Sequence, residues 1–373
     1  MTIHRFAFPT TIHFGPGARK LVAENLKAAG CKRPLLVTDK GLAALPVLEE
    51  FKSLFPGFAL EVFSGIQGNP TASQARAGAE AYRRHNADSV IGFGGGAALD
   101  VAKVVALMAV HPGDVLEYAW DHPGVRPIDK PLPHFVALPT TAGTGSEVGR
   151  SSVISEDDTH VKRIVFNAAL LAKAVFADPE LTLGLPPAIT AATGMDALTH
   201  NIESYLSPAY HPLCDGIALE GVRIAARALP LAFREPRNIQ ARGDMLMASM
   251  MGAIAFQKDL GAVHSCAHAL STVADLHHGL ANALMIEHVM RFNRPAAEEK
   301  MRELARVAGA ADLIEWLLKL KKELGIPSNL KSLGVKAEHV PRLVDVAVAD
   351  ICHQTNPRPC SRQDFEQLFA AAL

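Results

Sequence analysis

The sequence lacks an excess of either charge. Its 37 Lys and Arg residues are balanced by 38 Asp and Glu residues, which gives a formal net charge of −1 over 373 residues. It also lacks a block rich in Lys or Arg, the electrostatic footprint of nucleic-acid-binding proteins. The most basic stretch, YRRH at 82–85, fits the end of a helix, where cations interact favourably with the helix dipole. We therefore expect no nucleic-acid partner.

Long apolar runs and cysteine pairs are missing as well. The first 17 residues contain no apolar run of signal-peptide length. The longest apolar segment, Val101–Val110, is interrupted by Lys103 and is too short to span a bilayer. The five cysteines are odd in number and form no C-x-x-C pair, so reduced thiols are favoured over a disulfide framework. These absences predict a cytoplasmic protein with no membrane partner.

The first half of the chain alternates short apolar segments with segments of helical periodicity. A stretch such as 72–85 repeats its apolar residues with helical spacing. Three segments are typical of buried strands: 34–39, 89–93 and 134–138. Strands that alternate with helices indicate βαβ units, and therefore a parallel sheet with flanking helices.

The second half shows no clear strand after about residue 185. Ala-, Leu- and Met-rich stretches such as 241–256 predict helices, and Pro186-Pro187 suits the start of one. A chain of this length fits two domains at ~150 residues each. We therefore predict an α/β domain over 1–185 and an all-α domain over 186–373.

A glycine turn follows the second predicted strand. The segment 89–93 runs into GGGAALDVAK from Gly94, which is a strand, a glycine turn and a helix in succession. Glycines let the backbone approach a phosphate closely, and the new helix offers unpaired N–H groups to it. The spacing is not G-x-G-x-x-G, so the common dinucleotide fingerprint does not apply. A plain tight turn is the alternative.

A second turn, PTTAGTGSE from Pro139, follows the third predicted strand, and its hydroxyl and N–H groups suit phosphate or ribose. Two such turns at strand ends predict a nucleotide crevice in an open α/β sheet. Asp39 also ends a strand. A carboxylate there can accept hydrogen bonds from a ribose diol and repels a 2′-phosphate, which favours NAD over NADP. A helix cap before Gly41 is the alternative for Asp39.

A carboxylate and a histidine share one face of a predicted helix in the second half. Asp196 and His200 are four residues apart. The apolar stripe of the same helix lies away from that face, so the two side chains face either water or a polar cavity. The stripe consists of Met195, Leu198, Ile202 and Leu206.

Four more histidines lie in GAVHSCAHALSTVADLHHGL at 261–280. His264 and His268 are four residues apart among apolar neighbours, and His277 and His278 follow at what is expected to be the helix end. One Asp and several His on separate apolar helices suit divalent Fe or Zn. The spacing does not decide between His264 and His268, or between His277 and His278. A histidine of the core or of a helix end is the alternative for each.

These segments together resemble the iron-containing (group III) alcohol dehydrogenases over nearly the whole chain. The matching segments are FPT at 8–10 with FGPGA at 14–18, expected as an opening hairpin; GGGAALDVAK at 94–103; PTTAGTGSEV at 139–148; DPELTLGLPPAITAATGMDALTHNIESYLS at 178–207; GAVHSCAHALSTVADLHHGLANA at 261–283; and NPR at 356–358.

The resemblance implies an architecture and a metal site. The fold would be the dehydroquinate-synthase-like one, with an α/β dinucleotide-binding domain, an all-α domain and an active-site cleft between them. His268 would be a catalytic residue beside the nicotinamide and would not bind the metal. The ion would be Fe²⁺, with Zn²⁺ as the alternative. Its ligands, by position, would be Asp196, His200, His264 and His278.

The resemblance also implies the cofactor contacts. Asp39 would hold the adenosine ribose of NAD, Lys162 would contact the cofactor, and Leu181 would pack near it. The remaining contacts would come from the glycine turns: Gly95, Gly96, Ala97 and Asp100 in the first, and Thr140, Thr141 and Thr144 in the second.

The sequence departs from the family pattern at four positions. Ala97 stands where Ser is usual, so backbone N–H groups would serve the pyrophosphate there without a hydroxyl. His277 stands where Pro is common, and Ser271 where Gly is common. Arg150 lies where members line the substrate pocket variably, and it points either to solvent or to an anionic substrate group.

The activity implied is the NAD-linked interconversion of small primary alcohols or hydroxy-compounds and their aldehydes by hydride transfer, in a homodimer or larger homo-oligomer. Two alternatives use the same fold. A maleylacetate reductase-like enzyme reduces an acidic enone without this ligand set, and a glycerol-type polyol dehydrogenase uses fewer histidines. A non-catalytic nucleotide-binding protein would lack ligands or glycine turns, and none is missing here.

Overall fold

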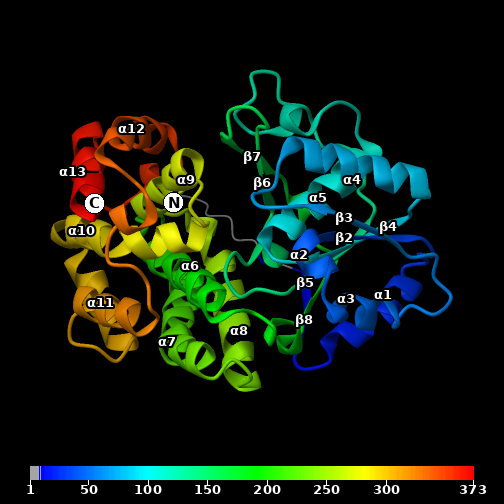
Figure 1. Ribbon diagram of the computed structural model, residues 1–373, viewed down its shortest axis with the longest axis horizontal. Helices are drawn as coiled ribbons and strands as arrows, with labels where there is room; N and C mark the ends of the chain where they lie inside the picture. The colour runs from blue at the N-terminus through cyan, green and yellow to red at the C-terminus, as the bar shows by residue number, and fades with distance from the viewer. Residues whose placement is uncertain (1–7, 9) are drawn as a thin grey trace, which may run out of the picture. The chain divides into compact units, whose positions relative to one another are not determined.

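Six parallel strands form the sheet of the first half of the chain, in the order β1-β8-β5-β4-β2-β3 (Figure 1). The structure is a computed structural model that describes residue 8 and residues 10–373. The strands are β1 (Thr11–Phe14), β2 (Pro34–Asp39), β3 (Glu61–Ile66), β4 (Ser89–Gly94), β5 (His134–Pro139) and β8 (Ala174–Ala177).

The three predicted strands are confirmed, and they are the neighbours β5, β4 and β2 in the middle of the sheet. Almost every residue in them is buried. Strands covered on both faces read as continuous apolar runs, which is why the sequence reveals them. Strands β1 and β3 lie at the two edges with partly exposed side chains, and β8 has only four residues, so a continuous apolar run reveals none of the three.

Helices cover both faces of this sheet. On one face, Phe93 of β4 stacks on Phe51 of α3, with ring centroids 4.7 Å apart. On the other face, a Cβ on Gly92 would lie 3.0 Å from the Leu99 side chain and 3.1 Å from that of Ala102, both in α5. The predicted fold class is therefore confirmed for this half. Its helices are α1 (Val22–Ala28), α2 (Lys40–Ala43), α3 (Pro46–Lys52), α4 (Ala72–His85) and α5 (Gly96–Val110).

A small antiparallel hairpin lies between β5 and β8 in the chain. Strand β6 (Ser151–Ser155) pairs with β7 (Lys162–Phe166) and follows a short 3₁₀ helix at Ser146–Val148. Asp100 of α5 joins the hairpin through its carboxylate, which accepts a hydrogen bond from the Val153 N–H at 3.0 Å.

The second half of the chain is helical, as predicted, and its described residues contain no strand after β8. In Figure 1 these helices run from green to red. They are α6 (Pro187–Leu206), α7 (Pro212–Arg234), α8 (Ile239–Ala255), α9 (Ala262–Ala274), α10 (His278–Val307), α11 (Leu313–Glu323), α12 (Val340–Ala349) and α13 (Arg362–Ala372).

Helix α6 is the centre of this half. It begins at Pro187, a position where proline loses no helical hydrogen bond, and every residue from Thr190 to Ser204 is buried. Two glycines bring neighbouring helices close to it. A Cβ on Gly279 of α10 would lie 2.2 Å from the Ala192 carbonyl oxygen, and one on Gly252 of α8 would lie 2.8 Å from the His200 Cβ. A helix enclosed on all sides holds its polar side chains in fixed surroundings.

The described chain divides into two compact units. One consists of Phe8–Thr141 and Ser146–Thr182, and the other of Ala142–Gly145 and Leu183–Leu373. The second glycine turn is therefore split between them, whereas the sequence pattern assigns all of it to the α/β domain. The reason is close packing, because a Cβ on Gly145, whose φ is +58°, would lie 2.3 Å from the Ala253 Cβ in α8.

Two further expectations concern the chain ends and the membrane. The segment expected as an opening hairpin contains residue 9, which lies outside the described residues. Within that segment, Thr11–Phe14 form β1, which pairs in parallel with β8. Across the part of the chain that the structure describes, no helix combines the length and the apolar character needed to cross a bilayer.

Candidate metal centre and cofactor turns

Helix α6 presents Asp196 and His200 on one buried face. Their exposed fractions are 2% and 6%, so the face that was expected to meet either water or a polar cavity is closed to water. The His200 Nε2 atom lies 4.0 Å from Asp196 Oδ1. Burial lowers the pKa of His200 to about 4, so this imidazole is neutral near pH 7. A neutral ring is the form that ligates metals.

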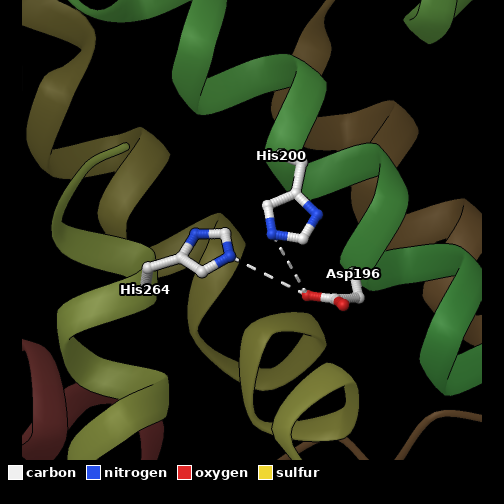
Figure 2. A group of neighbouring side chains, drawn as sticks. All are labelled: Asp196, His200 and His264. Carbon is white, nitrogen blue, oxygen red and sulfur yellow. Dashed lines mark ion pairs between the residues drawn. The ribbon is translucent and has the colours of Figure 1, made fainter. Parts of the chain in front are cut away.

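Two histidines from other helices complete the group. The Nε2 atoms of His264 in α9 and His278 in α10 lie 3.8 Å and 3.4 Å from Asp196 Oδ1. Figure 2 shows the His200 and His264 rings pointing toward the Asp196 carboxylate. Ligand atoms about 2.1 Å from one tetrahedral ion are about 3.4 Å apart. Nitrogen and carboxylate donors at these separations fit Fe²⁺ or Zn²⁺.

His278 does not lie where the sequence pattern put it. It was expected at the end of the helix that carries His264, but α9 ends at Ala274 and His278 is the first residue of α10. Asp275 adopts a left-handed conformation, with φ of 51°, and ends α9. Of the four histidines in this segment, the structure brings His264 and His278 to Asp196, and His277 is exposed at the N-cap of α10.

Glu203, which was not among the predicted site residues, orients His264. Its carboxylate lies 2.6 Å from His264 Nδ1, and both groups are buried. The same carboxylate accepts hydrogen bonds from the backbone N–H groups of Val263, at 2.7 Å, and His264, at 3.3 Å. Since a carboxylate only accepts, it places the ring proton on Nδ1 and leaves the Nε2 lone pair toward Asp196. One signal was available, because Glu203 lies three residues after His200 on the same face of α6.

Asn282 of α10 was also missed. Its side-chain N–H donates to Asp196 Oδ1 at 2.7 Å, and the same nitrogen lies 3.4 Å from His264 Nε2 and 3.3 Å from His278 Nε2. Asn282 follows His278 by four residues, so both lie on one face of α10. The amide thereby fixes the direction of the carboxylate that all three histidines approach.

His268 lies beside this group and is paired with Asp350. The His268 Nδ1 atom lies 2.7 Å from Asp350 Oδ2, and the His268 ring stacks on His278 with centroids 5.2 Å apart. Donor atoms of His268, Asp350 and Cys352 all lie within 4.8 Å of one another. Burial raises the pKa of the Cys352 thiol well above its usual value, which disfavours the thiolate that a metal needs. A hydrogen-bonded His–Asp pair describes this second group better than a metal site.

The first glycine turn joins β4 to α5. No side chain caps the N-terminus of α5 at Gly95, so the first N–H groups of that helix suit an anion. A Cβ on Gly95 would lie 3.3 Å from the Thr141 side chain, which places the two glycine turns next to each other in the α/β unit. Gly94 has a φ of +156°, and a Cβ there would lie 2.6 Å from that of Ala98. The backbone at this turn therefore carries no side chain at Gly94, because a Cβ does not fit there.

Asp39 serves as a helix cap and also lies at this turn. Its Oδ1 atom accepts a hydrogen bond from the Leu42 N–H at 2.8 Å, so the capping alternative is confirmed. Its Oδ2 atom lies 3.5 Å from the Cβ position of Gly94. The carboxylate thus borders the turn that is predicted to bind the pyrophosphate.

The Asp100 carboxylate accepts hydrogen bonds from other groups of the protein. Its Oδ1 atom accepts from the Ser146 hydroxyl at 2.6 Å and its Oδ2 atom accepts from Val153. Lys103, which interrupts an apolar run of the sequence, is fully buried here and donates to Ser146 Oγ at 2.8 Å and to the Ser151 carbonyl at 2.6 Å. Asp100 and Lys103 therefore hold the second glycine turn and the hairpin to α5.

Glu147 is buried in the same place. Its Oε1 atom has no hydrogen-bond partner among the described residues, and burial raises its pKa to about 7. Desolvation likewise lowers the pKa of Lys103. These shifts belong to a polar cluster that is cut off from water beneath the turn.

The other residues predicted to contact the cofactor lie in different elements and in both units. Lys162 begins β7, and Leu181 is buried in the same apolar cluster as Phe93. Thr140 and Thr141 belong to the α/β unit and Thr144 to the helical one. The Arg150 guanidinium lies over the Phe166 ring, 5.6 Å from its centroid. Phe166 is largely exposed, so Arg150 has a stacking partner within its own unit.

Comparison with known proteins covers both halves of the chain. A family model described as "Iron-containing alcohol dehydrogenase" matches residues 9–179, and one described as "Fe-containing alcohol dehydrogenase family, C-terminal" matches residues 190–373. The chain is 38% identical to 4-hydroxybutyrate dehydrogenase of Cupriavidus necator, over 98% of each chain. It is 37% identical to 1,3-propanediol dehydrogenase of Klebsiella pneumoniae, over 99% of this chain and 98% of the relative.

Two solved structures also match this chain over its full length. A structure of 1,3-propanediol oxidoreductase matches with a TM-score of 0.94 at 35% identity and covers 100% of both chains. Sulfoacetaldehyde reductase from Bifidobacterium kashiwanohense, solved in complex with NAD⁺, matches with a TM-score of 0.90 at 29% identity. It covers 100% of this chain and 99% of that one.

Proposed function

Since the chain belongs to the iron-containing alcohol dehydrogenase family and is an alcohol dehydrogenase by that membership, we propose that it interconverts small primary alcohols or ω-hydroxy compounds and their aldehydes with NAD(H) and a divalent metal ion. The observation that carries the proposal is that donor atoms of Asp196, His200 and His264 all lie within 4.8 Å of one another, with His278 Nε2 3.4 Å from Asp196 Oδ1. The proposed ligands are Asp196, His200, His264 and His278.

Fe²⁺, or alternatively Zn²⁺, held by these donors would supply Lewis-acid polarisation of the substrate oxygen. The protein's own residues supply the rest. Glu203 and Asn282 hold two donors in the required orientation. The proposed catalytic role of His268 beside the nicotinamide is supported by the position of its ring, which stacks on a proposed ligand.

NAD(H) is proposed as the cofactor, bound by the α/β domain over 1–185, while the helical domain over 186–373 holds the metal. The uncapped N-terminus of α5 suits the pyrophosphate. The Asp39 carboxylate beside it suits a ribose diol and disfavours a 2′-phosphate. The NAD⁺ complex of sulfoacetaldehyde reductase and the name of the relative "NAD-dependent methanol dehydrogenase" agree with this choice.

Two relatives act on compounds that carry a hydroxyl group at a chain end, according to their names. We therefore propose this substrate class, with 4-hydroxybutyrate and 1,3-propanediol as the first compounds to test. The chain is also proposed to form a homodimer or a larger homo-oligomer, as the family resemblance implies, and light scattering in solution measures this.

The test measures NADH oxidation with a panel of aldehydes on chelator-treated protein, before and after adding Fe²⁺ without oxygen, or Zn²⁺. Activity should be lost on chelation and return with metal. Full activity of metal-free protein would contradict the proposal, and turnover of an acidic enone without metal would favour the maleylacetate reductase alternative. His264→Ala and His278→Ala should lose bound metal. His277→Pro should keep it, because His277 already has a φ of −55°.

A further inference from the structure

Asp350 is held in place by three hydrogen bonds where the chain leaves α12. Its Oδ1 atom accepts from the Ser265 hydroxyl at 2.7 Å and from the Cys352 N–H at 2.9 Å, while its Oδ2 atom faces His268 Nδ1 at 2.7 Å. The Ser265 hydroxyl itself accepts a hydrogen bond from the His353 N–H at 2.9 Å. The carboxylate is only 15% exposed, and its position is therefore fixed by groups before and after it in the chain.

The charge on Asp350 determines what His268 can do. Burial opposes its ionisation, but His268 and the hydrogen bonds from Ser265 and Cys352 hold the pKa of this carboxyl well below its usual range. An ionised carboxylate only accepts hydrogen bonds, so the proton of the neutral His268 ring lies on Nδ1 and its Nε2 atom lacks one. Ring stacking on His278, with an interplanar angle of 21°, limits rotation of the same ring.

We propose that Asp350 is a positioning residue for hydride transfer, because it fixes both the ring orientation and the tautomer of His268 so that Nε2 is an acceptor. The inference rests on the proposed function, in which His268 lies beside the nicotinamide. Among the described residues, the hydrogen bonds of Asp350 join it to Ser265, His268 and Cys352 and to none of the four donor groups of the metal site. Its loss is therefore expected to impair turnover while metal binding persists.

The Asp350→Asn variant tests this directly. Its Oδ1 atom can still accept from Ser265 and Cys352, but its amide nitrogen would then face His268 Nδ1 and donate to it, which inverts the tautomer. In the serine-protease triad, the corresponding Asp→Asn change lowers kcat by about 10⁴ through the same inversion. His268 is not a nucleophile's base here, so we expect a smaller fall in kcat, on the order of 10²-fold. Metal content should stay at one ion per chain, and the KM for NAD⁺ should change far less than kcat.

The matched control is Asp345→Asn. Asp345 lies on α12, is about half exposed and pairs with Arg362, so this change leaves His268 untouched. Its kcat should stay within about twofold of the wild type, since surface changes of this kind have small effects. A kcat of Asp350→Asn equal to that of the control would overturn the proposal, as would loss of metal from Asp350→Asn. Binding of a second Zn²⁺ that requires both Asp350 and Cys352 would also overturn it, in favour of a metal site.

A spectroscopic readout separates this inference from the proposed function. The Zn²⁺-loaded wild type with ¹⁵N-labelled histidine should show the His268 proton on Nδ1, with the signal assigned by its disappearance in His268→Gln. A proton on Nε2 in the wild type would overturn the inference whether or not Asp350→Asn folds. If the wild type is inert toward every aldehyde with metal present, the proposed function fails, while the tautomer measurement still decides the role of Asp350.

Discussion

At the scale of single residues, the metal centre depends on side chains that hold other side chains. His264 approaches Asp196 only in one ring orientation, and Glu203 supplies the contact that selects it. The same carboxylate accepts from the N–H groups of Val263 and His264 in the first turn of α9, whose N-cap Gly261 has no side chain to do so. One glutamate thus orients a proposed ligand and anchors the helix that carries it.

Glu203→Gln tests the orienting role. The amide can donate to His264 Nδ1 in place of accepting from it, so Nε2 would be presented less often as a ligand. Outer-sphere changes of this kind cost about 10- to 100-fold in metal affinity, and we expect a loss in that range. Competition with a chelator for Zn²⁺ measures it. Glu220→Gln on α7, where Glu220 pairs with Arg223, is the matched control, and equal affinities in the two variants would exclude the role.

Glu147 predicts a pH dependence of stability. Burial raises its pKa from 4.5 to about 7, so between these values the folded state keeps a proton that the unfolded state has lost. The contribution of Glu147 to the free energy of unfolding therefore falls as pH rises from about 4.5 to 7, on the order of 3 kcal/mol in all. Urea denaturation at several pH values should show this slope in the wild type and a smaller one in Glu147→Gln. Glu61→Gln, at an exposed position in β3, should keep the wild-type slope.

At the scale of elements, the metal site depends on how closely α10 approaches α6. Gly279 follows His278 directly, and the space for a Cβ there is filled by the Ala192 carbonyl oxygen of α6. The two helices therefore meet backbone to backbone beside Asp196 and His278. A larger residue at this position would move a proposed ligand together with its helix.

Gly279→Ala should separate the two helices. The added Cβ would lie 2.2 Å from the Ala192 oxygen, and overpacking of this kind costs about 1–3 kcal/mol. We expect a lower denaturation midpoint together with weaker Zn²⁺ binding. Gly216→Ala in α7 is the control, because its Cβ meets nothing within 4 Å and alanine favours a helix by about 0.5–1 kcal/mol. A Gly279→Ala protein as stable as Gly216→Ala, with intact metal binding, would contradict the packing argument.

At the scale of the whole molecule, the proposed metal ion and the proposed cofactor NAD(H) bind different units. All four proposed metal ligands lie in the helical unit, and Asp39 with the first glycine turn lies in the α/β unit. A ligand slows amide hydrogen exchange most where it stabilises the fold directly. Adding Zn²⁺ should therefore protect α6, α9 and α10, and adding NAD⁺ should protect the ends of β2 and β4. Hydrogen exchange followed by mass spectrometry measures both, and protection of the sheet by Zn²⁺ alone would contradict the assignment.

The sequence predicted the fold class and the middle of the sheet because burial on both faces leaves a continuous apolar run in β2, β4 and β5. The pair Asp196 and His200 followed from helical spacing alone. Helical spacing did not predict that His278 lies beside Asp196, because this contact requires the break at Asp275 and the turn into α10. Resemblance supplied that ligand. Glu203 lies on the same face of α6 as His200, but its contact with His264, like the contact of Asn282 with Asp196, joins two helices whose proximity no local pattern reveals.

The split of the second glycine turn has a consequence for synthesis on the ribosome. The α/β unit is complete once Thr182 has emerged, but Ala142–Gly145 belong with helices that are made later. Domains generally fold as units from the N-terminus during synthesis. The turn must therefore wait without its packing partners until α6 and α8 have been translated. For the same reason, a fragment that begins at residue 186 lacks a piece of its own core, and the two units do not separate at a single cut in the chain.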